Sequence, residues 1–236
     1  MTSLNDDILS LFQNSVSADF QSDGTGSNTL LYPRGGFMAK KIIVLLAEGF
    51  EEVETITPID YLRRAGIEVT VAAVGQETPL VKGAHDIQVA ADTTLSALAA
   101  QKKLDAAAWD GVVVPGGLPG ADNLAASAET GAFLKNMAGA GKLVSAICAS
   151  PVRVLAPLGV LAGKKFTCYP GQEKFLDVNA SSPGAELTPD RVVVDGNIIT
   201  SRSAGTAGEF ARAIVAELVG EAEAGKLAEK LLLPAP

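Results

Sequence analysis

The stretch that most constrains the fold of this chain changes its hydrophobic period at a cysteine. Leu143–Ile147 is a short apolar run that follows Gly139-Ala140-Gly141, which is typical of a buried β-strand. Pro151 suits the first turn of a helix, where its missing N–H is not needed. The apolar residues that come next recur at helical spacing: Val152, Leu155 and Leu158. The pattern therefore predicts that Cys148 lies at an elbow between a strand and a helix.

A cysteine at the start of a helix has a distinctive electrostatic environment. The positive end of the helix stabilises a thiolate, so we expect the pKa of Cys148 to lie below its ordinary value of about 8.5. Such a cysteine is a candidate nucleophile. Free cysteines are also among the most buried residues, so Cys148 could instead be a packed thiol without a chemical role.

Composition narrows the class of protein. The chain has 236 residues, of which 47% are hydrophobic and 19% charged, as expected for a soluble protein with one good core. A formal net charge of −8 argues against nucleic acid or an anionic membrane as a partner, and no run of 18 apolar residues predicts a membrane span. Two cysteines make no disulfide framework, so we expect a reducing, cytoplasmic location.

The first 37 residues differ from the rest. They are rich in Ser, Asn, Gly and Asp, and they have neither the basic start and apolar centre of a secretory signal nor the arginines of a transit peptide. Residues 7–12 could form one or two helical turns, but we expect residues 1–37 to be a mostly disordered extension. The folded domain is predicted to span residues 38–236.

From Lys41 onward, apolar runs alternate with segments of helical period. This order predicts an α/β domain with a doubly wound, mostly parallel sheet and helices on both faces. The predicted strands are 42–46, 67–74, 111–114, 143–147, 165–168, 191–194 and 198–200, with a small hairpin over 80–90. The predicted helices are 51–64, 96–103, 130–139, the segment after Cys148, 206–217 and 221–233. In the first helix, Val53, Ile56, Ile59 and Leu62 form the expected buried face.

Ligands in such sheets bind beyond the carboxyl ends of the strands. Three parts of the sequence fall at those ends: Cys148, the pair Gly116-Gly117 and the segment 48–54. This convergence favours a reactive role for Cys148. Glycines after a strand permit a close approach of the backbone. Their spacing, with Gly120, is not that of a dinucleotide site, and we find no phosphate-binding loop, so a kinase is rejected.

At this point several motifs, in the right order from about Lys41 to the end, carry a resemblance to a known family. The chain is similar to the DJ-1 (ThiJ/PfpI) superfamily, in particular its DJ-1 and bacterial ThiJ-type branch. The matching stretches are Ala47–Thr55, Pro58–Asp60, Arg63–Gly66, Val114–Gly117, Ala146–Ala149 and Thr200–Arg202. The protease-like PfpI branch has a histidine directly after the cysteine, where this chain has Ala149. The resemblance implies a flavodoxin-like fold.

The resemblance also implies a site. Cys148 matches the family's easily oxidised, reactive cysteine, and Glu54 matches a glutamate whose protonated carboxyl donates a hydrogen bond to that sulfur. The N–H groups of Gly117 and Ala149 match an oxyanion-hole-like pair. From the residues alone, Glu54 reads instead as a solvated residue in an acidic first helical turn. We expect neither a cofactor nor a metal ion.

Other residues match less well. Family members with glyoxalase-type activity have a histidine where this chain has Tyr169, so that base is absent. The only histidine, His85, matches an arginine at the mouth of the site, and Arg64 matches an arginine near it. His85, Arg64 and Gly116 are therefore possible substrate-binding residues. We expect Cys168 to be a packed thiol, although a redox role stays open.

Two functions of different classes follow from the resemblance. The first is a glyoxalase or deglycase that uses Cys148 and Glu54 to convert a small 2-oxoaldehyde to a hydroxy acid. The second is a redox-sensing stress protein or chaperone in which Cys148 is oxidised. Family members are generally dimers, so we expect a homodimer through the first helix, where Asp60 and Arg64 could reach the partner.

Overall fold

Seven short strands form the sheet at the centre of the computed structural model, which describes residues 39–176 and 181–233. The strands are β1 (Lys41–Ala47), β2 (Glu68–Val74), β5 (Thr93–Thr94), β6 (Gly111–Val114), β7 (Leu143–Ile147), β10 (Val192–Asp195) and β11 (Ile198–Ser201). They lie in the order β10-β11-β7-β6-β1-β2-β5, and only the β10–β11 pair is antiparallel. The predicted doubly wound, mostly parallel sheet is confirmed.

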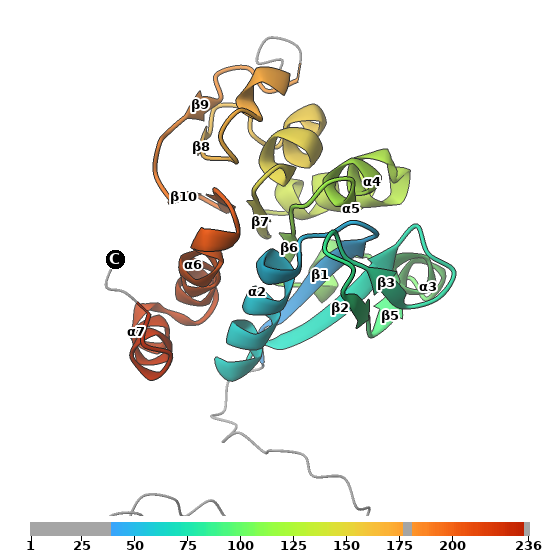
Figure 1. Cartoon of the computed structure of the whole chain (residues 1–236), viewed down its shortest axis with the longest axis horizontal. Helices are drawn as coiled ribbons and strands as arrows, with labels where there is room; N and C mark the ends of the chain where they lie inside the picture. Colours follow the sequence, from blue (N-terminus) through green and yellow to red (C-terminus); the bar gives the residue numbers. More distant parts are fainter. Residues whose placement is uncertain (1–38, 177–180, 234–236) are drawn as a thin grey trace, which may run out of the picture. The chain divides into compact units, whose positions relative to one another are not determined.

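Helices cover both faces of this sheet (Figure 1). One face packs against α2 (Glu52–Arg64), α6 (Ala207–Val219) and α7 (Glu221–Lys230), and the other against α3 (Leu95–Ala100), α4 (Gly120–Ala126) and α5 (Ala128–Gly139). Because both faces are covered, β6 and β7 are buried along their whole length. This explains why the central strands are continuous aliphatic runs in the sequence.

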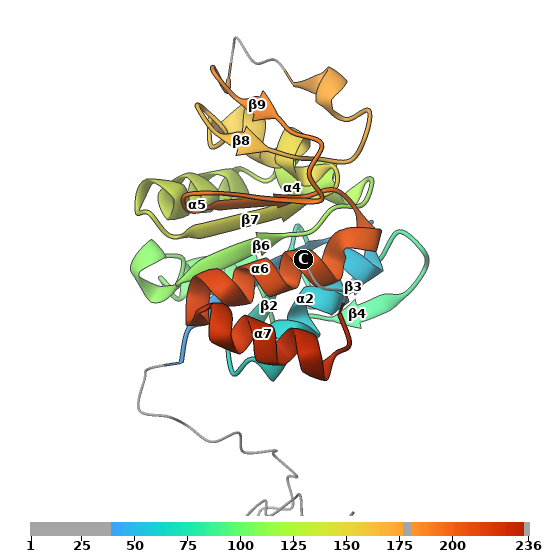
Figure 2. The ribbon, with the colours of Figure 1, turned by 90° about the vertical axis from the view of Figure 1, so that its left-hand side faces the viewer.

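Two small sheets lie outside the central one. The predicted hairpin forms from β3 (Leu80–Lys82) and β4 (Gln88–Ala90). A second pair joins β8 (Lys165–Phe166) to β9 (Glu186–Leu187), and Figure 2 shows it beyond the β7 end of the molecule. The predicted strand 165–168 is therefore two residues too long. It ends early because the N–H of Thr167 donates to the Thr200 hydroxyl, 2.9 Å away, and not to a neighbouring strand.

Three helical predictions need correction. The segment after Cys148 is no α-helix: Pro151–Leu155 is a π-helical turn and Ala156–Leu158 a 3-10 turn. Helix α4 was not predicted, because its seven residues contain a single large apolar side chain, Leu124. In α2, Val53 and Ile56 are exposed, whereas Glu52 and Glu54 are buried with Ile59 and Leu62.

The sheet order reverses between β1 and β6. The chain passes from β1 through α2 to β2 on one side, and β6 and β7 then add on the other side of β1. The carboxyl ends of β1, β6 and β7 therefore surround a crevice of the kind in which α/β proteins bind ligands. Residues 38–236 form one compact unit. The segment 7–12 lies outside the described residues, and no helix among those described is long and apolar enough to cross a membrane.

Candidate active site

The backbone at Cys148 is held in an uncommon conformation. Its φ of 66° is in the left-handed region, which side chains other than glycine rarely adopt. Two hydrogen bonds fix it: the Cys148 N–H donates to the Ser201 carbonyl at 2.9 Å, and the Tyr169 N–H donates to the Cys148 carbonyl at 2.8 Å. Strain that the surrounding structure maintains in this way is typical of functional sites. The predicted elbow is therefore present, although a π-helical turn follows it.

The Glu54 carboxyl reaches the sulfur from the first turn of α2. Glu51 caps this helix, because its Oε2 accepts a hydrogen bond of 2.6 Å from the Glu54 N–H. Glu54 is 1% exposed, and its carboxyl bonds to the Cys148 thiol and to the Gly116 N–H, with 3.1 Å from Oε2 to that nitrogen. Glu54 is thus no solvated surface residue, and the contact implied by the resemblance is present.

Two backbone N–H groups complete the surroundings of the sulfur. Those of Gly117 and Ala149 both hydrogen bond to it. Gly117 has a φ of 93°, and a Cβ there would lie 2.5 Å from the Gly49 carbonyl oxygen. A Cβ on Gly116 would lie 2.5 Å from the Cβ of Cys148 and would also collide with the Glu54 carboxyl. The segment after β6 therefore requires both glycines: Gly116 where it approaches Cys148 and Glu54, and Gly117 where it approaches the backbone of residues 49–51.

Burial governs the protonation of this pair. It raises the pKa of the Glu54 carboxyl to about 7 against the hydrogen bonds that lower it, and the charge of Glu51 adds to the rise. Burial also raises the pKa of the Cys148 thiol to about 12, and the Glu54 carboxylate acts in the same direction. The prediction of a lowered thiol pKa is thus wrong. The short π-helical turn and the two N–H groups do not outweigh burial and a neighbouring anion.

The pair therefore shares one proton over the neutral range. Its first proton leaves near pH 7 and its second only near pH 12. Because the two groups interact strongly, these values belong to the pair. A shared proton between a sulfur nucleophile and a carboxyl of pKa about 7 is what general acid–base chemistry at neutral pH requires.

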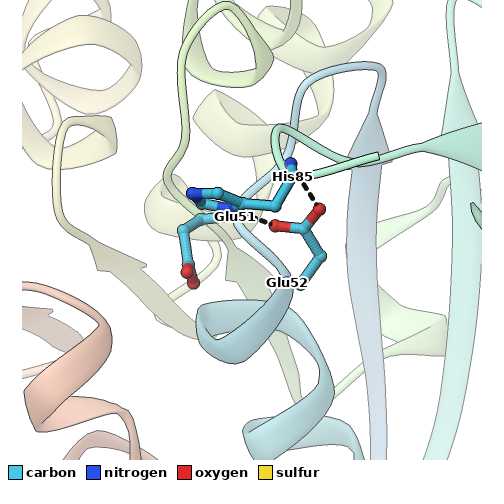
Figure 3. Close-up of side chains that lie close together, drawn as sticks. All are labelled: Glu51, Glu52 and His85. Carbon is cyan, nitrogen blue, oxygen red and sulfur yellow. Dashed lines mark hydrogen bonds and ion pairs between the residues drawn. The ribbon is translucent and has the colours of Figure 1, made fainter. Parts of the chain in front are cut away.

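His85 lies beside Glu52 (Figure 3). Its Nδ1 is 2.7 Å from Glu52 Oε2, and its backbone N–H donates to Oε1 at 2.7 Å. The hydrogen bond with Glu52 raises the pKa of His85. Burial acts to raise the pKa of Glu52, but the hydrogen bonds from His85 prevail and lower it. The exposed imidazole is therefore held against the Glu52 carboxylate, which favours the charged form of His85.

Glu51, Glu52 and His85 are also the residues best placed to hold a metal ion. Their ligand atoms lie within 4.8 Å of one another. However, Glu51 already caps α2, and both Glu52 oxygens are bound by His85. Glu52 and His85 thus satisfy each other and Glu51 caps α2, so these contacts account for the positions of the three side chains.

The remaining predicted residues differ in how close they lie to Cys148. Arg64 is ten positions after Glu54 on α2, about 15 Å along the helix, and its Nε bonds to Asp60 Oδ2 at 2.6 Å. Tyr169 is half-exposed and contacts Cys148 through its backbone N–H. Cys168 is buried, and burial, followed by the charge of Glu173, raises its thiol pKa to about 11. Within one chain, Arg64 is not brought to the site.

Sequence reasoning missed the residues that act through their backbone. The Ser201 carbonyl holds the Cys148 N–H, and the Ala204 N–H bonds to the Glu54 carboxyl. Neither residue type carries a signal for such a role. The only hint in the sequence is position: residues 198–204 form β11, the strand next to β7, and the short segment after it.

Comparison with known proteins agrees with this geometry. The model of the DJ-1/PfpI family matches residues 40–217. The chain is 43% identical over 198 residues to protein dj-1beta of Drosophila melanogaster, covering 83% of this chain and 98% of that protein. It is 35% identical over 193 residues to the glutathione-independent glyoxalase DJR-1.2 of Caenorhabditis elegans, covering 81% of this chain and 95% of that one.

A solved structure gives the same result in three dimensions. That of oxidized Toxoplasma gondii DJ-1 superposes with a TM-score of 0.75 at 36% identity, covering 84% of this chain and all of that one. The fold is therefore flavodoxin-like, as the sequence predicted. The chain matches the family in sequence and in fold. It therefore belongs to the DJ-1/PfpI family.

Proposed function

We propose that the protein is a cofactor-free enzyme that converts small 2-oxoaldehydes to 2-hydroxy acids, with Cys148 as nucleophile and Glu54 as proton carrier. The observation that carries this proposal is the Cys148–Glu54 contact beneath two backbone N–H groups. A family relative that is named as a glyoxalase supports the same reaction class. Deglycation of glycated amines would use the same first steps.

In the proposed reaction, the Cys148 sulfur attacks the aldehyde carbon of methylglyoxal while its proton passes to the Glu54 carboxylate. Glu54 passes this proton on to the carbonyl oxygen, which becomes the hydroxyl of a hemithioacetal, and the Gly117 and Ala149 N–H groups stabilise the charge that develops on it. Glu54, again a carboxylate, then moves the proton of this carbon to the neighbouring carbon, while the hydroxyl proton passes to the ketone oxygen, which gives a thioester of the 2-hydroxy acid. Water then hydrolyses the thioester to lactate and restores the thiol. Overall, methylglyoxal and one water molecule are converted to lactic acid.

The test is lactate formation from methylglyoxal by purified protein that is free of contaminating glyoxalases. We expect Cys148→Ala to lose the activity, because it removes the proposed nucleophile, and Cys168→Ala to keep it. The proposal would be abandoned if wild type formed no more lactate than Cys148→Ala.

A second candidate is redox sensing through the same sulfur. Cys148 is only partly buried, and the N–H groups and Glu54 that surround it could hold the oxygens of a sulfinate. Two equivalents of peroxide would add two oxygen atoms to the sulfur and release two molecules of water. Peptide mapping after mild peroxide should find Cys148 oxidised first. Earlier oxidation of Cys168 or methionine would exclude this role.

The exposed apolar residues of α2 support a homodimer. Val53 and Ile56 are 48% and 42% exposed on a helix that is otherwise well packed. An interface there would cover them and could place Asp60 and Arg64 near the partner. Ile56→Glu should give a monomer in sedimentation, whereas Val194→Glu, at an equally exposed position on β10, should not. An unchanged mass for Ile56→Glu would place the interface elsewhere.

A cytoplasmic location is consistent with both candidates. Cys148 and Cys168 are free thiols, as expected in a reducing compartment. Cell fractionation with a native antibody tests this directly, and recovery in an oxidising compartment would contradict it.

A further inference from the structure

One peptide group links a buried serine to the Glu54 carboxyl. It consists of the Pro115 carbonyl and the Gly116 N–H, just after β6. Its oxygen accepts a hydrogen bond of 2.5 Å from the Ser150 hydroxyl, and its N–H donates to Glu54 Oε2 at 3.1 Å. The Glu54 carboxyl also bonds to the Cys148 thiol. These groups therefore form a continuous chain of hydrogen bonds that ends at the proposed nucleophile.

The hydrogen-bond chain is buried along its length. Ser150 is 0% and Glu54 1% exposed, and Pro115 and Gly116 are buried as well. In a buried chain each hydrogen bond polarises the next, so a peptide whose oxygen accepts a bond becomes a better donor at its nitrogen. The Ser150 hydroxyl therefore strengthens the bond from the Gly116 N–H to the Glu54 carboxylate.

Ser150 belongs to the elbow that carries the nucleophile. It lies two residues after Cys148 and directly after Ala149, whose N–H bonds to the sulfur. By donating to the Pro115 carbonyl, its hydroxyl joins the segment after β7 to the segment after β6. Gly117, whose N–H also bonds to the sulfur, lies on that second segment. The hydroxyl thus connects the two sides of the site.

The next peptide group has the same arrangement without a side chain. Its Gly116 oxygen accepts from the Glu51 N–H at 3.0 Å, and its Gly117 N–H bonds to the Cys148 sulfur. Two successive peptide groups therefore each accept a bond at the oxygen and hold a group of the site at the nitrogen. Of the two donors, only the Ser150 hydroxyl can be removed without changing the backbone.

Two ionisable groups act on the Glu54 carboxyl from the elements packed against it. They are the Cys148 thiol at the end of β7 and the Glu51 carboxyl at the start of α2. Burial has the largest influence on the Glu54 pKa and raises it, whereas hydrogen bonds from the Gly116 and Ala204 N–H groups lower it. A stronger bond from the first of these N–H groups lowers the pKa further.

We propose that Ser150 is a positioning residue, whose hydroxyl holds the Pro115–Gly116 peptide so that the Gly116 N–H stabilises the Glu54 carboxylate. This role rests on the proposed function, in which Glu54 must accept a proton at neutral pH. The hydroxyl acts through the peptide and not on the reacting atoms.

The test compares the pH midpoint of Cys148 alkylation in wild type and in Ser150→Ala, read on the full-length protein by mass spectrometry. Loss of the hydroxyl weakens the Gly116 donor, so the Glu54 carboxyl should hold its proton to higher pH. We expect the midpoint to rise from near pH 7 by about 0.3 unit, because polarisation strengthens a charge-assisted bond by roughly 10–30%. An unchanged or lowered midpoint would overturn the inference.

Ser145 provides a matched control. Its hydroxyl is also 0% exposed, and it donates to another β6 carbonyl, that of Val112, at 2.7 Å. Ser145 lies three residues before Cys148 on β7, about 10 Å along the strand. Ser145→Ala should lower the thermal unfolding midpoint about as much as Ser150→Ala but leave the alkylation midpoint unchanged. Equal alkylation shifts in the two variants would indicate a general loosening of the sheet and contradict the inference.

A double variant shows whether the effect passes through Glu54. In Glu54→Gln no carboxyl titrates at this position, so adding Ser150→Ala should not shift the Cys148 midpoint further. A shift as large as in wild type would mean that Ser150 acts on the sulfur directly, and it would refute the proposed path. Alkylation requires no turnover, so a protein that formed no lactate would still show the Ser150 effect. Failure of the proposed function and failure of this inference are therefore distinguishable.

Discussion

The two cysteines of this protein lie in the same domain but in different chemical surroundings: Cys148 is partly buried and Cys168 fully buried. Burial raises the thiol pKa of both, to about 12 at Cys148 and about 11 at Cys168. Cys148 also has a strained backbone, two N–H groups on its sulfur and a carboxyl that shares its proton. Cys168 has no positive φ, and the contacts of its thiol are one backbone N–H, that of Glu173, and the charges of Glu173 and Arg202. The comparison teaches that reactivity here comes from a coupled neighbour and not from the thiol pKa alone.

The largest effect should come from Gly117, which lets the segment after β6 approach the backbone of residues 49–51. Gly117→Ala adds a Cβ 2.5 Å from the Gly49 carbonyl oxygen at a φ of 93°, so it should destabilise the protein by a few kcal/mol. Gly139→Ala is the control, because nothing lies within 4 Å of its Cβ. Urea unfolding measures both, and equal stabilities would mean that the close approach is not real.

Removing the ionisable group of Glu54 should stabilise the protein at neutral pH. The folded state holds the Glu54 proton up to about pH 7, whereas the unfolded state loses it near the ordinary carboxyl pKa of 4.5. Glu54 therefore costs nothing below about pH 4.5, and its cost grows until about pH 7, to at most about 3 kcal/mol. Glu54→Gln removes this cost.

The measurement is urea unfolding of wild type and Glu54→Gln from pH 4.5 to 8. The stability difference should increase with pH in favour of the variant and level off above about pH 7. A difference that is constant with pH would show that the Glu54 carboxyl is not perturbed.

Glycine substitution sharpens the contrast between the two cysteines. At Cys148, Gly should be more stable than Ala by about 1 kcal/mol, because glycine accepts a positive φ without strain. At Cys168, which has no such φ, Gly should be less stable than Ala by about 0.5–1 kcal/mol. Thermal unfolding of the four variants checks this, and the same sign at both positions would contradict the strained elbow.

The smallest effect concerns the rim of the site. The raised pKa of His85 adds stability below pH 6.5 that is lost as the pH rises through the folded value. The lowered pKa of Glu52 adds stability above pH 4.5 that is lost on acidification. His85→Gln should therefore destabilise most between about pH 4.5 and 6.5 and least at pH 8. A pH-independent difference in the unfolding midpoint would rule out the ion pair.

The sequence was sufficient for the fold, because a buried parallel strand leaves a plain signal. Leu143–Ile147 and Gly111–Val114 are short runs of mostly apolar residues, and both were predicted as strands. The π-helical turn at Pro151–Leu155 was not predicted, because its apolar spacing resembles that of an α-helix over so few residues. Local periodicity does not distinguish the two.

The site was less accessible to sequence reasoning. In α2 the helical period predicted Val53 and Ile56 as core, but Glu52 and Glu54 are buried instead. A carboxyl enters the interior only where tertiary contacts receive it, here His85 and the Cys148–Gly116 pair. Those partners are distant in the chain, so only the family resemblance pointed to Glu54.

The most direct test of the account is the pH dependence of Cys148 alkylation in wild type and in Glu54→Gln, read by mass spectrometry with Cys168 as internal control. If the pair shares one proton, wild-type Cys148 should gain reactivity near pH 7, whereas in Glu54→Gln the gain should move to a pH above the ordinary thiol value of about 8.5. Cys168 should react only at high pH in both proteins. Identical midpoints for Cys148 in the two proteins would show that Glu54 and Cys148 titrate independently, and the coupled pair would be refuted.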